Sequence, residues 1–213
     1  MPELTAEFIQ AALDEYRVWD LGNDVLYALC ADHPGHTAAD AIIAKMWLIG
    51  RSYAAAAERR HIEDNLSGDE FYTKSLAPTI INKKIDLWFQ ELKCDKTNSR
   101  ELNLRTHKKM VELLKELTGH NKRSLASKYL HFHFPGRFFI YDNRSSTSVW
   151  QVLARGRKHE IPAQLANVDK DYQKFFSGCE QLSLCIRGLI GKSPTPREVD
   201  KVLLHWSSLT AAR

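Results

Sequence analysis

The feature of this sequence best suited to chemistry is an acidic residue at the end of an apolar stretch. Asp142 follows the segment SLASKYLHFHFPGRFFIY, residues 124–141, in which aromatic and histidine side chains are unusually frequent. The first part of this segment has the periodicity of a buried helix, and Pro135-Gly136 should end that helix because proline cannot continue it. Residues 138–141 are then predicted to be extended. The sequence therefore places a carboxylate at the end of a segment that lies in the core.

An aspartate in this position has two interpretations. In the first, Asp142 is the N-cap of a helix that begins at Asn143 and carries Val149 and Leu153 on its apolar face. Such a cap contributes about 1 kcal/mol and needs no further function. In the second, the carboxylate lies on the wall of a cleft, where it can act on a ligand. The two roles are compatible.

Basic residues are concentrated around this acid. They are Lys108, Lys109, Lys115, Lys122, Arg123, Lys128, Arg137 and Arg144, and Arg155, Arg157 and Lys158 follow closely. A solvated helix face is the ordinary explanation of such a run. A positive surface around one carboxylate would also suit a ligand with a phosphate backbone.

The composition is typical of a soluble globular protein. The 213 residues are 44% hydrophobic and 26% charged, with a formal net charge of +4, which excludes a disordered tail. No apolar run approaches the roughly 20 residues of a membrane span. The start, Met1-Pro2-Glu3-Leu4, lacks the pattern of a signal peptide, so we expect a cytoplasmic protein that does not contact membranes.

The cysteines and histidines predict no metal site. The four cysteines match no metal-binding or redox spacing, and we expect them to be reduced thiols. His131 and His133 are two positions apart, and such side chains diverge on a helix. Zinc needs a set of convergent ligands, which this pair does not supply. We therefore predict neither a metal nor a cofactor.

Helical periodicity recurs along the whole chain, and strand signals are almost absent. Thr5 and Ser99 are predicted to cap helices. The predicted helices cover about 5–16, 23–30, 37–63, 78–92, 99–117, 122–134, 143–153, 169–190 and 194–209. We expect an all-α protein, residues 1–213, with two lobes at about 1–98 and 99–213 and a cleft between them.

The region from residue 99 to residue 155 resembles the helix-hairpin-helix DNA glycosylases, especially divergent bacterial proteins of the 8-oxoguanine glycosylase type. In that family, the hairpin between two helices reads roughly Leu-Pro-Gly-x-Gly-x-Lys, and the loop after the second helix ends in Val-Asp. Here LTGHNKR, residues 117–123, lies at the hairpin, and Ile140-Tyr141-Asp142 ends the loop. The helix-hairpin-helix-like motif would cover 99–134, with a tight turn at Gly119–Asn121.

The resemblance implies that Asp142 is the catalytic aspartate and that Gly119 is the first hairpin glycine. Asn121 replaces the second glycine, although asparagine tolerates a positive φ better than most residues. Arg123 stands where bifunctional members carry the lysine that forms a Schiff base. Because a guanidinium stays protonated, it cannot be that nucleophile, so the implied enzyme is a monofunctional glycosylase.

The implied reaction releases a damaged or modified base, either in repair or in defence against phage DNA with modified bases. A carboxylate would stabilise the positive charge that develops on the sugar, after the base has flipped into a pocket. The residues expected to bind double-stranded DNA are Gly119, Asn121, Lys122, Arg123, Ser124, Lys128 and Arg144. The residues expected to line the base pocket are Trp47, Arg51, Tyr53 and Tyr141, near a helix that Gly50 and the alanines 54–57 make thin on one face.

Two other functions fit the same residues. The first is a non-catalytic helix-hairpin-helix module that binds DNA and uses Asp142 only as a cap, which the altered hairpin favours. The second is an all-α protein-interaction subunit whose basic residues only increase solubility. In each case we expect a monomer.

Overall fold

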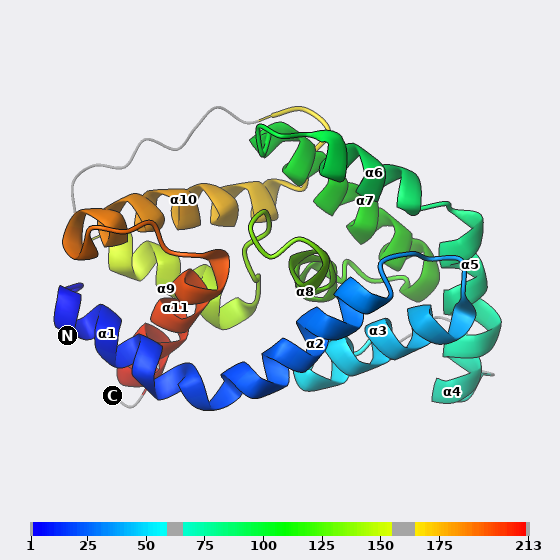
Figure 1. Ribbon diagram of the computed structural model, residues 1–213, viewed down its shortest axis with the longest axis horizontal. Helices are drawn as coiled ribbons and strands as arrows, with labels where there is room; N and C mark the ends of the chain where they lie inside the picture. The colour runs from blue at the N-terminus through cyan, green and yellow to red at the C-terminus, as the bar shows by residue number, and fades with distance from the viewer. Residues whose placement is uncertain (1, 59–65, 155–164, 212–213) are drawn as a thin grey trace.

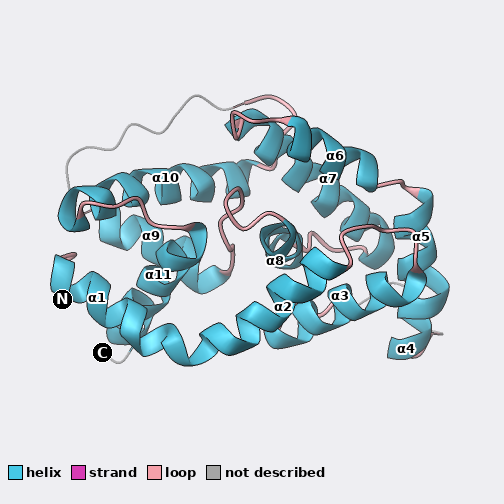
Figure 2. Ribbon diagram, viewed as in Figure 1, coloured by secondary structure: helices cyan, strands magenta, loops and turns pink. Residues whose placement is uncertain are grey.

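The computed structural model describes residues 2–58, 66–154 and 165–211, and these residues form helices joined by loops (Figure 1). No strand occurs in these three ranges (Figure 2). The all-α prediction is therefore confirmed. None of the helices within these ranges is both long enough and apolar enough to cross a membrane.

The helices follow one another with short connections. In the first half they are α1 (Ala6–Glu15), the 3-10 helix η1 (Tyr16–Trp19), α2 (Asp20–Asp32), α3 (Ala39–Ser52), α4 (Gly68–Glu70), the π-helix η2 (Phe71–Leu76), α5 (Ala77–Asn82) and α6 (Asp86–Cys94). In the second half they are α7 (Arg100–Thr118), α8 (Arg123–His133), α9 (Asn143–Leu153), α10 (Lys170–Ile190) and α11 (Pro196–Ala211).

Side-chain caps explain where three of these helices begin. Thr5 accepts the backbone N–H of Phe8, and Ser99 accepts that of Leu102. Asp142 accepts the N–H of Ser145 at 2.8 Å. Each bond satisfies an amide that has no partner inside the helix, so the predicted caps are confirmed.

The helix predicted over 37–63 ends much earlier, at Ser52. Ala55 donates its N–H to the carbonyl of Gly50 at 2.7 Å, and Ala54 donates to Arg51 at 3.2 Å. These two bonds form a Schellman motif, in which the residue after the cap is left-handed. Here that residue is Ala54, with a φ of 51°. The alanines 54–57 therefore form a turn and not the expected thin helix face.

The prediction of one helix over 78–92 is also wrong. Lys84 has a φ of 50°, which separates α5 from α6. The tight turn after α7 is confirmed, because Gly119 ends α7 at a φ of 70° and α8 begins at Arg123. Asn121, however, is not among the residues with positive φ in the described part of the chain, so it does not replace a glycine conformationally.

The buried apolar side chains form two clusters. The first cluster comes from α2 to α8, with the loop residue Phe138, and the second from α1, α9, α10 and α11, joined by Leu104 of α7. The N-terminal helix α1 packs against α10 and α11, at the same end of the molecule in Figure 1. The division between the clusters does not fall at residue 98, because α1 belongs with the C-terminal helices.

Candidate functional site

The segment that leads to Asp142 is fixed along its length. The ring of His131 hydrogen-bonds the carbonyl of Phe138 at 2.8 Å. The hydroxyl of Tyr172 donates to the carbonyl of Phe139 at 2.9 Å. The N–H of Tyr141 donates to the hydroxyl of Ser127 at 3.0 Å. These bonds to α8 and α10 replace the ladder of a sheet, so an extended segment can be buried.

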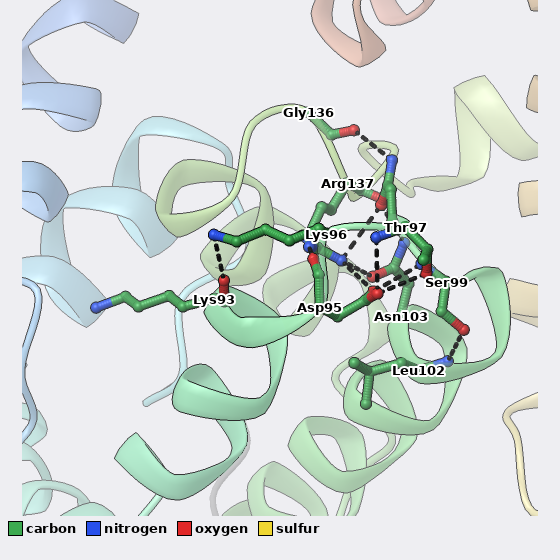
Figure 3. A network of polar contacts seen from close by, with 10 residues as sticks. Lys93, Asp95, Lys96, Thr97, Ser99, Leu102, Asn103, Gly136 and Arg137 are labelled. Carbon is green, nitrogen blue, oxygen red and sulfur yellow. Dashed lines mark hydrogen bonds and ion pairs between the residues drawn. The ribbon is translucent and has the colours of Figure 1, made fainter.

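A polar network holds the start of the same loop (Figure 3). Asp95 accepts a hydrogen bond from Nη1 of Arg137 at 3.0 Å. The side-chain amide of Asn98 donates to the carbonyl of Gly136 at 3.3 Å. The network ties this loop to the link between α6 and α7. Arg137, which the sequence places in the basic cluster, is thus an anchor of the loop that positions Asp142.

Asp142 uses its two carboxylate oxygens differently. Oδ1 accepts the N–H of Ser145 and caps α9. Oδ2 lies 3.7 Å from Nζ of Lys128, which is an ion pair too long to be a direct hydrogen bond. The side chain of Asp142 is 29% exposed, so the carboxylate caps the helix and still reaches the surface.

Lys128 is almost completely buried, with a side chain 2% exposed. Its ammonium donates to the hydroxyl of Ser124 at 2.7 Å and lies 5.3 Å from the centre of the Tyr53 ring, where a cation is attracted to the ring face. Burial lowers the pKa of Lys128. The negative charges of Asp142 and Asp200 act in the other direction and raise it, but the effect of burial is larger. The sequence places Lys128 among the DNA contacts, whereas its amine lies inside the protein beside the carboxylate.

A second ion pair lies behind Asp142. The hydroxyl of Ser145 donates to Oδ1 of Asp200 at 3.2 Å, and Nη1 of Arg197 lies 2.5 Å from Oδ2. Burial raises the pKa of Asp200 to about 6, although Arg197 opposes the shift. Ser145 therefore contacts both carboxylates. We call Lys128, Asp142, Ser145, Arg197 and Asp200 the Asp142 cluster.

Arg197 and Asp200 were not predicted as site residues from the sequence. The sequence contains a signal for Asp200, which stands among the apolar residues Val199, Val202 and Leu203 of α11, all of them buried. A charge inside an apolar stripe must be paired within the fold. The sequence could not identify the partners.

The helix-start cavity, of about 420 Å³, has Tyr141 and Asn143, the chain neighbours of Asp142, in its wall. It is lined by Ala54, Ala55, Ala56, Asn121, Lys122, Arg123, Ser124, Leu125, Tyr141 and Asn143. The first turn of α8 forms part of this wall, and Lys122 provides no side-chain cap for it. Arg123 binds Asp169 at 2.7 Å and Asp171 at 3.0 Å, so its charge is largely compensated.

The aromatic cavity, of about 500 Å³, is a second hollow near this segment, with Arg144 in its wall. It is lined by Tyr16, Trp19, Gly22, Asn23, Leu26, Ser52, Tyr53, Arg144, Arg197 and Leu204. Residues close to Asp142 in the chain line both cavities, since Tyr141 and Asn143 line the first and Arg144 lines the second. Lys128 joins them in space through Ser124 and Tyr53.

The four residues expected in the base pocket do not come together. Tyr53 lines the aromatic cavity, and Tyr141 lines the helix-start cavity. Arg51 is an exposed partner of Glu58, at 2.5 Å, and Trp47 is 43% exposed; both lie outside the linings of these two cavities.

The expected DNA contacts divide in a similar way. Asn121, Lys122, Arg123 and Ser124 surround the helix-start cavity, whereas Arg144 lines the aromatic cavity. Lys108 pairs with Glu112, and Lys109 with Glu91, as on a solvated helix face. The predicted basic residues Arg155, Arg157 and Lys158 lie outside the described residues.

A second buried polar group lies in the first core cluster. Nδ1 of His36 is 2.6 Å from Asp86, and its Nε2 is 2.7 Å from the hydroxyl of Tyr129. Lys45 donates to the carbonyls of His33 and Gly35, and burial lowers its pKa to about 8. We call His36, Lys45, Asp86 and Tyr129 the His36 cluster. None of its members lines the helix-start cavity or the aromatic cavity.

The described ranges contain no group of three or more His, Cys, Asp or Glu side chains that could hold a metal ion. His131, one of the pair considered from the sequence, hydrogen-bonds Tyr27 at 2.6 Å as well as Phe138.

Comparisons of the chain with protein-family models, with curated proteins and with solved structures find no match.

Proposed function

We propose that this protein is a monofunctional DNA N-glycosylase in which Asp142 is the catalytic carboxylate. The observation that carries this proposal is the position of Asp142. It is a partly exposed carboxylate at the end of a fixed buried segment and beside a buried amine, and its neighbours in the chain line two cavities. One cavity borders a helix start and the other is lined by aromatic rings.

In the proposed reaction, a water molecule attacks C1′ of a flipped nucleotide. The N-glycosidic bond breaks, and the base leaves with the bonding electrons and takes up a proton. Positive charge develops on the sugar during this step, and Asp142 stabilises that charge. A carboxylate in a partly buried site acts more strongly than one in bulk water. The products are a free base and an abasic strand.

Lys128 holds the carboxylate in this scheme. Its ammonium is positioned by Ser124 and lies beside Oδ2 of Asp142. Because an ammonium is not a nucleophile, a protonated Lys128 keeps water as the attacking group. Arg123 cannot form a Schiff base either. The proposal therefore retains the monofunctional mechanism.

The helix-start cavity would take a DNA phosphate. Helix N-termini bind anions through free backbone N–H groups and the helix dipole. Gly119 turns the chain so that α8 starts at this cavity, and Lys122 adds a positive charge to its wall. In this proposal, α7, the turn and α8 form a helix-hairpin-helix-like element, and double-stranded DNA lies across the region between two lobes. The enzyme would act as a cytoplasmic monomer without a cofactor.

Asp142→Asn tests the proposal, because asparagine can still accept the N–H of Ser145 and cap α9. We expect release of base from modified duplexes to fall about a hundredfold or more, while DNA binding and thermal stability stay close to those of the wild type. Asp40→Asn is a matched control. Asp40 accepts the N–H of Ala41 in the first turn of α3, at the opposite end of that helix from Tyr53. An Asp142→Asn protein with full excision activity would show that the carboxylate is only structural.

A non-catalytic DNA-binding module is the second candidate. The specific observation in its favour is that capping of α9 and pairing with Lys128 already give Asp142 two structural roles. This candidate predicts salt-dependent binding of duplex DNA without release of any base.

A further inference from the structure

The aromatic cavity has the chemistry of a recognition site for a planar ring. Tyr16, Trp19 and Tyr53 lie on its wall, and aromatic side chains stack on nucleic-acid bases. Its volume of about 500 Å³ is in the range that holds a drug-sized ligand, so the cavity has room for more than an unmodified base.

The polar groups of this cavity are mostly hydrogen-bond donors. Arg144 and Arg197 line it, and a guanidinium can only donate. Nε of Arg197 is buried and makes no hydrogen bond within the described residues. Asn23 offers little acceptor capacity, since its carbonyl oxygen already accepts the hydroxyl of Tyr53 at 2.6 Å. A ligand that fits this wall supplies acceptors.

Arg197 is a positioned donor and not a mobile surface charge. Asp200 holds its guanidinium at 2.5 Å, and Ser145 holds Asp200. The same Ser145 donates its backbone N–H to Asp142. Ser145, at the start of α9, therefore connects Arg197 on the cavity wall with the carboxylate of Asp142.

We propose that the aromatic cavity receives the flipped base, and that this base carries a bulky substituent rich in hydrogen-bond acceptors, such as a sugar. The ring stacks against Tyr53 or Trp19, and the substituent accepts hydrogen bonds from Arg197 and Arg144. This inference rests on the proposed glycosylase function and defines its substrate class. It also moves the base pocket away from Trp47 and Arg51.

Gly22→Phe tests the inference without removing any contact. Gly22 lies in α2 on the cavity wall, and a Cβ built there meets no atom within 4 Å. Replacing a helical glycine does not weaken the helix, so the variant should fold. Gly188→Phe in α10 is the matched control, because its Cβ also meets no atom within 4 Å and Gly188 does not line this cavity.

The substrates are two duplexes that differ at one cytosine, which carries either a 5-methyl group or a glucosylated 5-hydroxymethyl group. We expect the wild type to release the glucosylated base at least about tenfold faster than the methylated one. Gly22→Phe should lose about tenfold or more on the glucosylated base, and this loss should exceed any loss on the methylated base. Gly188→Phe should match the wild type.

Binding of the same duplexes to Asp142→Asn, with and without Gly22→Phe, separates this inference from the proposed function. Excision that does not distinguish the two bases, or that Gly22→Phe leaves unchanged on both, would overturn the inference and keep the glycosylase. A third outcome is that no base is released, but the glucosylated duplex binds more tightly than the methylated one and Gly22→Phe removes this difference. That outcome would support the cavity assignment and reject catalysis. If neither excision nor such binding occurs, both are wrong.

Discussion

Lys45 and Lys128 are both buried lysines, but they end in different surroundings. The ammonium of Lys45 donates to the backbone carbonyls of His33 at 2.7 Å and Gly35 at 2.9 Å. The ammonium of Lys128 has one hydroxyl partner and a carboxylate at 3.7 Å, and Ser124 and Tyr53 around it line two cavities. The first lysine fastens a loop after α2, and the second lies between residues that line two cavities.

The comparison shows that burial of a charge does not by itself identify a functional site. In the His36 cluster, both ring nitrogens of His36 have close partners, in Asp86 and Tyr129. In the Asp142 cluster, the carboxylate is partly exposed and Nε of Arg197 lacks a hydrogen bond among the described residues. Polar groups that are left available beside a cavity, and not the number of buried charges, distinguish the two regions.

The largest expected effect concerns stability and belongs to the His36 cluster. Lys45→Met removes a buried ammonium that donates to the carbonyls of His33 and Gly35, and we expect it to lower the free energy of unfolding by about 4 kcal/mol. Urea denaturation measures this change. Excision per folded molecule should stay unchanged, and the exposed Lys83→Met, which breaks only the surface pair with Glu116, is the control. If Lys45→Met kept full stability but lost excision activity, the His36 cluster could not be described as structural in contrast to the Asp142 cluster.

The next effect is a pH response of the Asp142 cluster. The pKa of Asp200 is about 6 in the folded protein against 3.8 for the ordinary side chain, with Arg197, Asp142, Lys128 and Ser145 around it. Between these values the folded state holds a proton that the unfolded state releases. Acidification from pH 6 to pH 4 should therefore stabilise the wild type relative to Asp200→Asn, by about 2 kcal/mol.

Thermal unfolding of both proteins at a series of pH values measures this difference. The ion pair between Asp200 and Arg197 is lost in the same window, so excision should decrease below pH 6. Parallel stability profiles for the wild type and Asp200→Asn would show that Asp200 is charged over the whole range from pH 4 to pH 6. The Asp142 cluster would then have no pH response.

The smallest expected effect is on the rate of excision. Lys128→Met keeps most of the side-chain volume and removes the charge beside Asp142, and we expect excision to fall about tenfold. The free energy of unfolding should change much less than in Lys45→Met, because Asp142 is partly exposed and does not become a buried unpaired charge.

Borohydride should trap no covalent adduct with the wild type. An adduct that forms with the wild type and with Lys122→Met but not with Lys128→Met would make Lys128 the nucleophile.

Local signals in the sequence predicted the elements that position the site. Ser99 and Gly119 mark the two ends of α7, and Asp142 marks the start of α9; each acts through backbone groups close to it in the chain. The ends of α3 and α5 were missed because Ala54 and Lys84 adopt left-handed conformations that their residue types do not favour. Such positions are imposed by the packing around them.

The composition of the candidate site was predicted less well, because it depends on contacts between distant segments. Lys128 appears basic and exposed in the sequence, but its amine is covered by Tyr53, which follows the last residue of α3. Asp200 meets Ser145 across a separation of 55 residues. No periodicity within α8 or α11 contains this information.

The packing of α1 has a consequence for the order in which the chain folds during synthesis. Helix α1 leaves the ribosome before the other described helices, but its buried residues Ile9 and Ala12 pack in the cluster built by α9, α10 and α11. The helices of the first cluster can associate earlier, since domains form as their segments emerge. Arg197 and Asp200 belong to α11, so the aromatic cavity is completed only when this last helix docks. A nascent chain that is still being translated could therefore have a folded half and no recognition site.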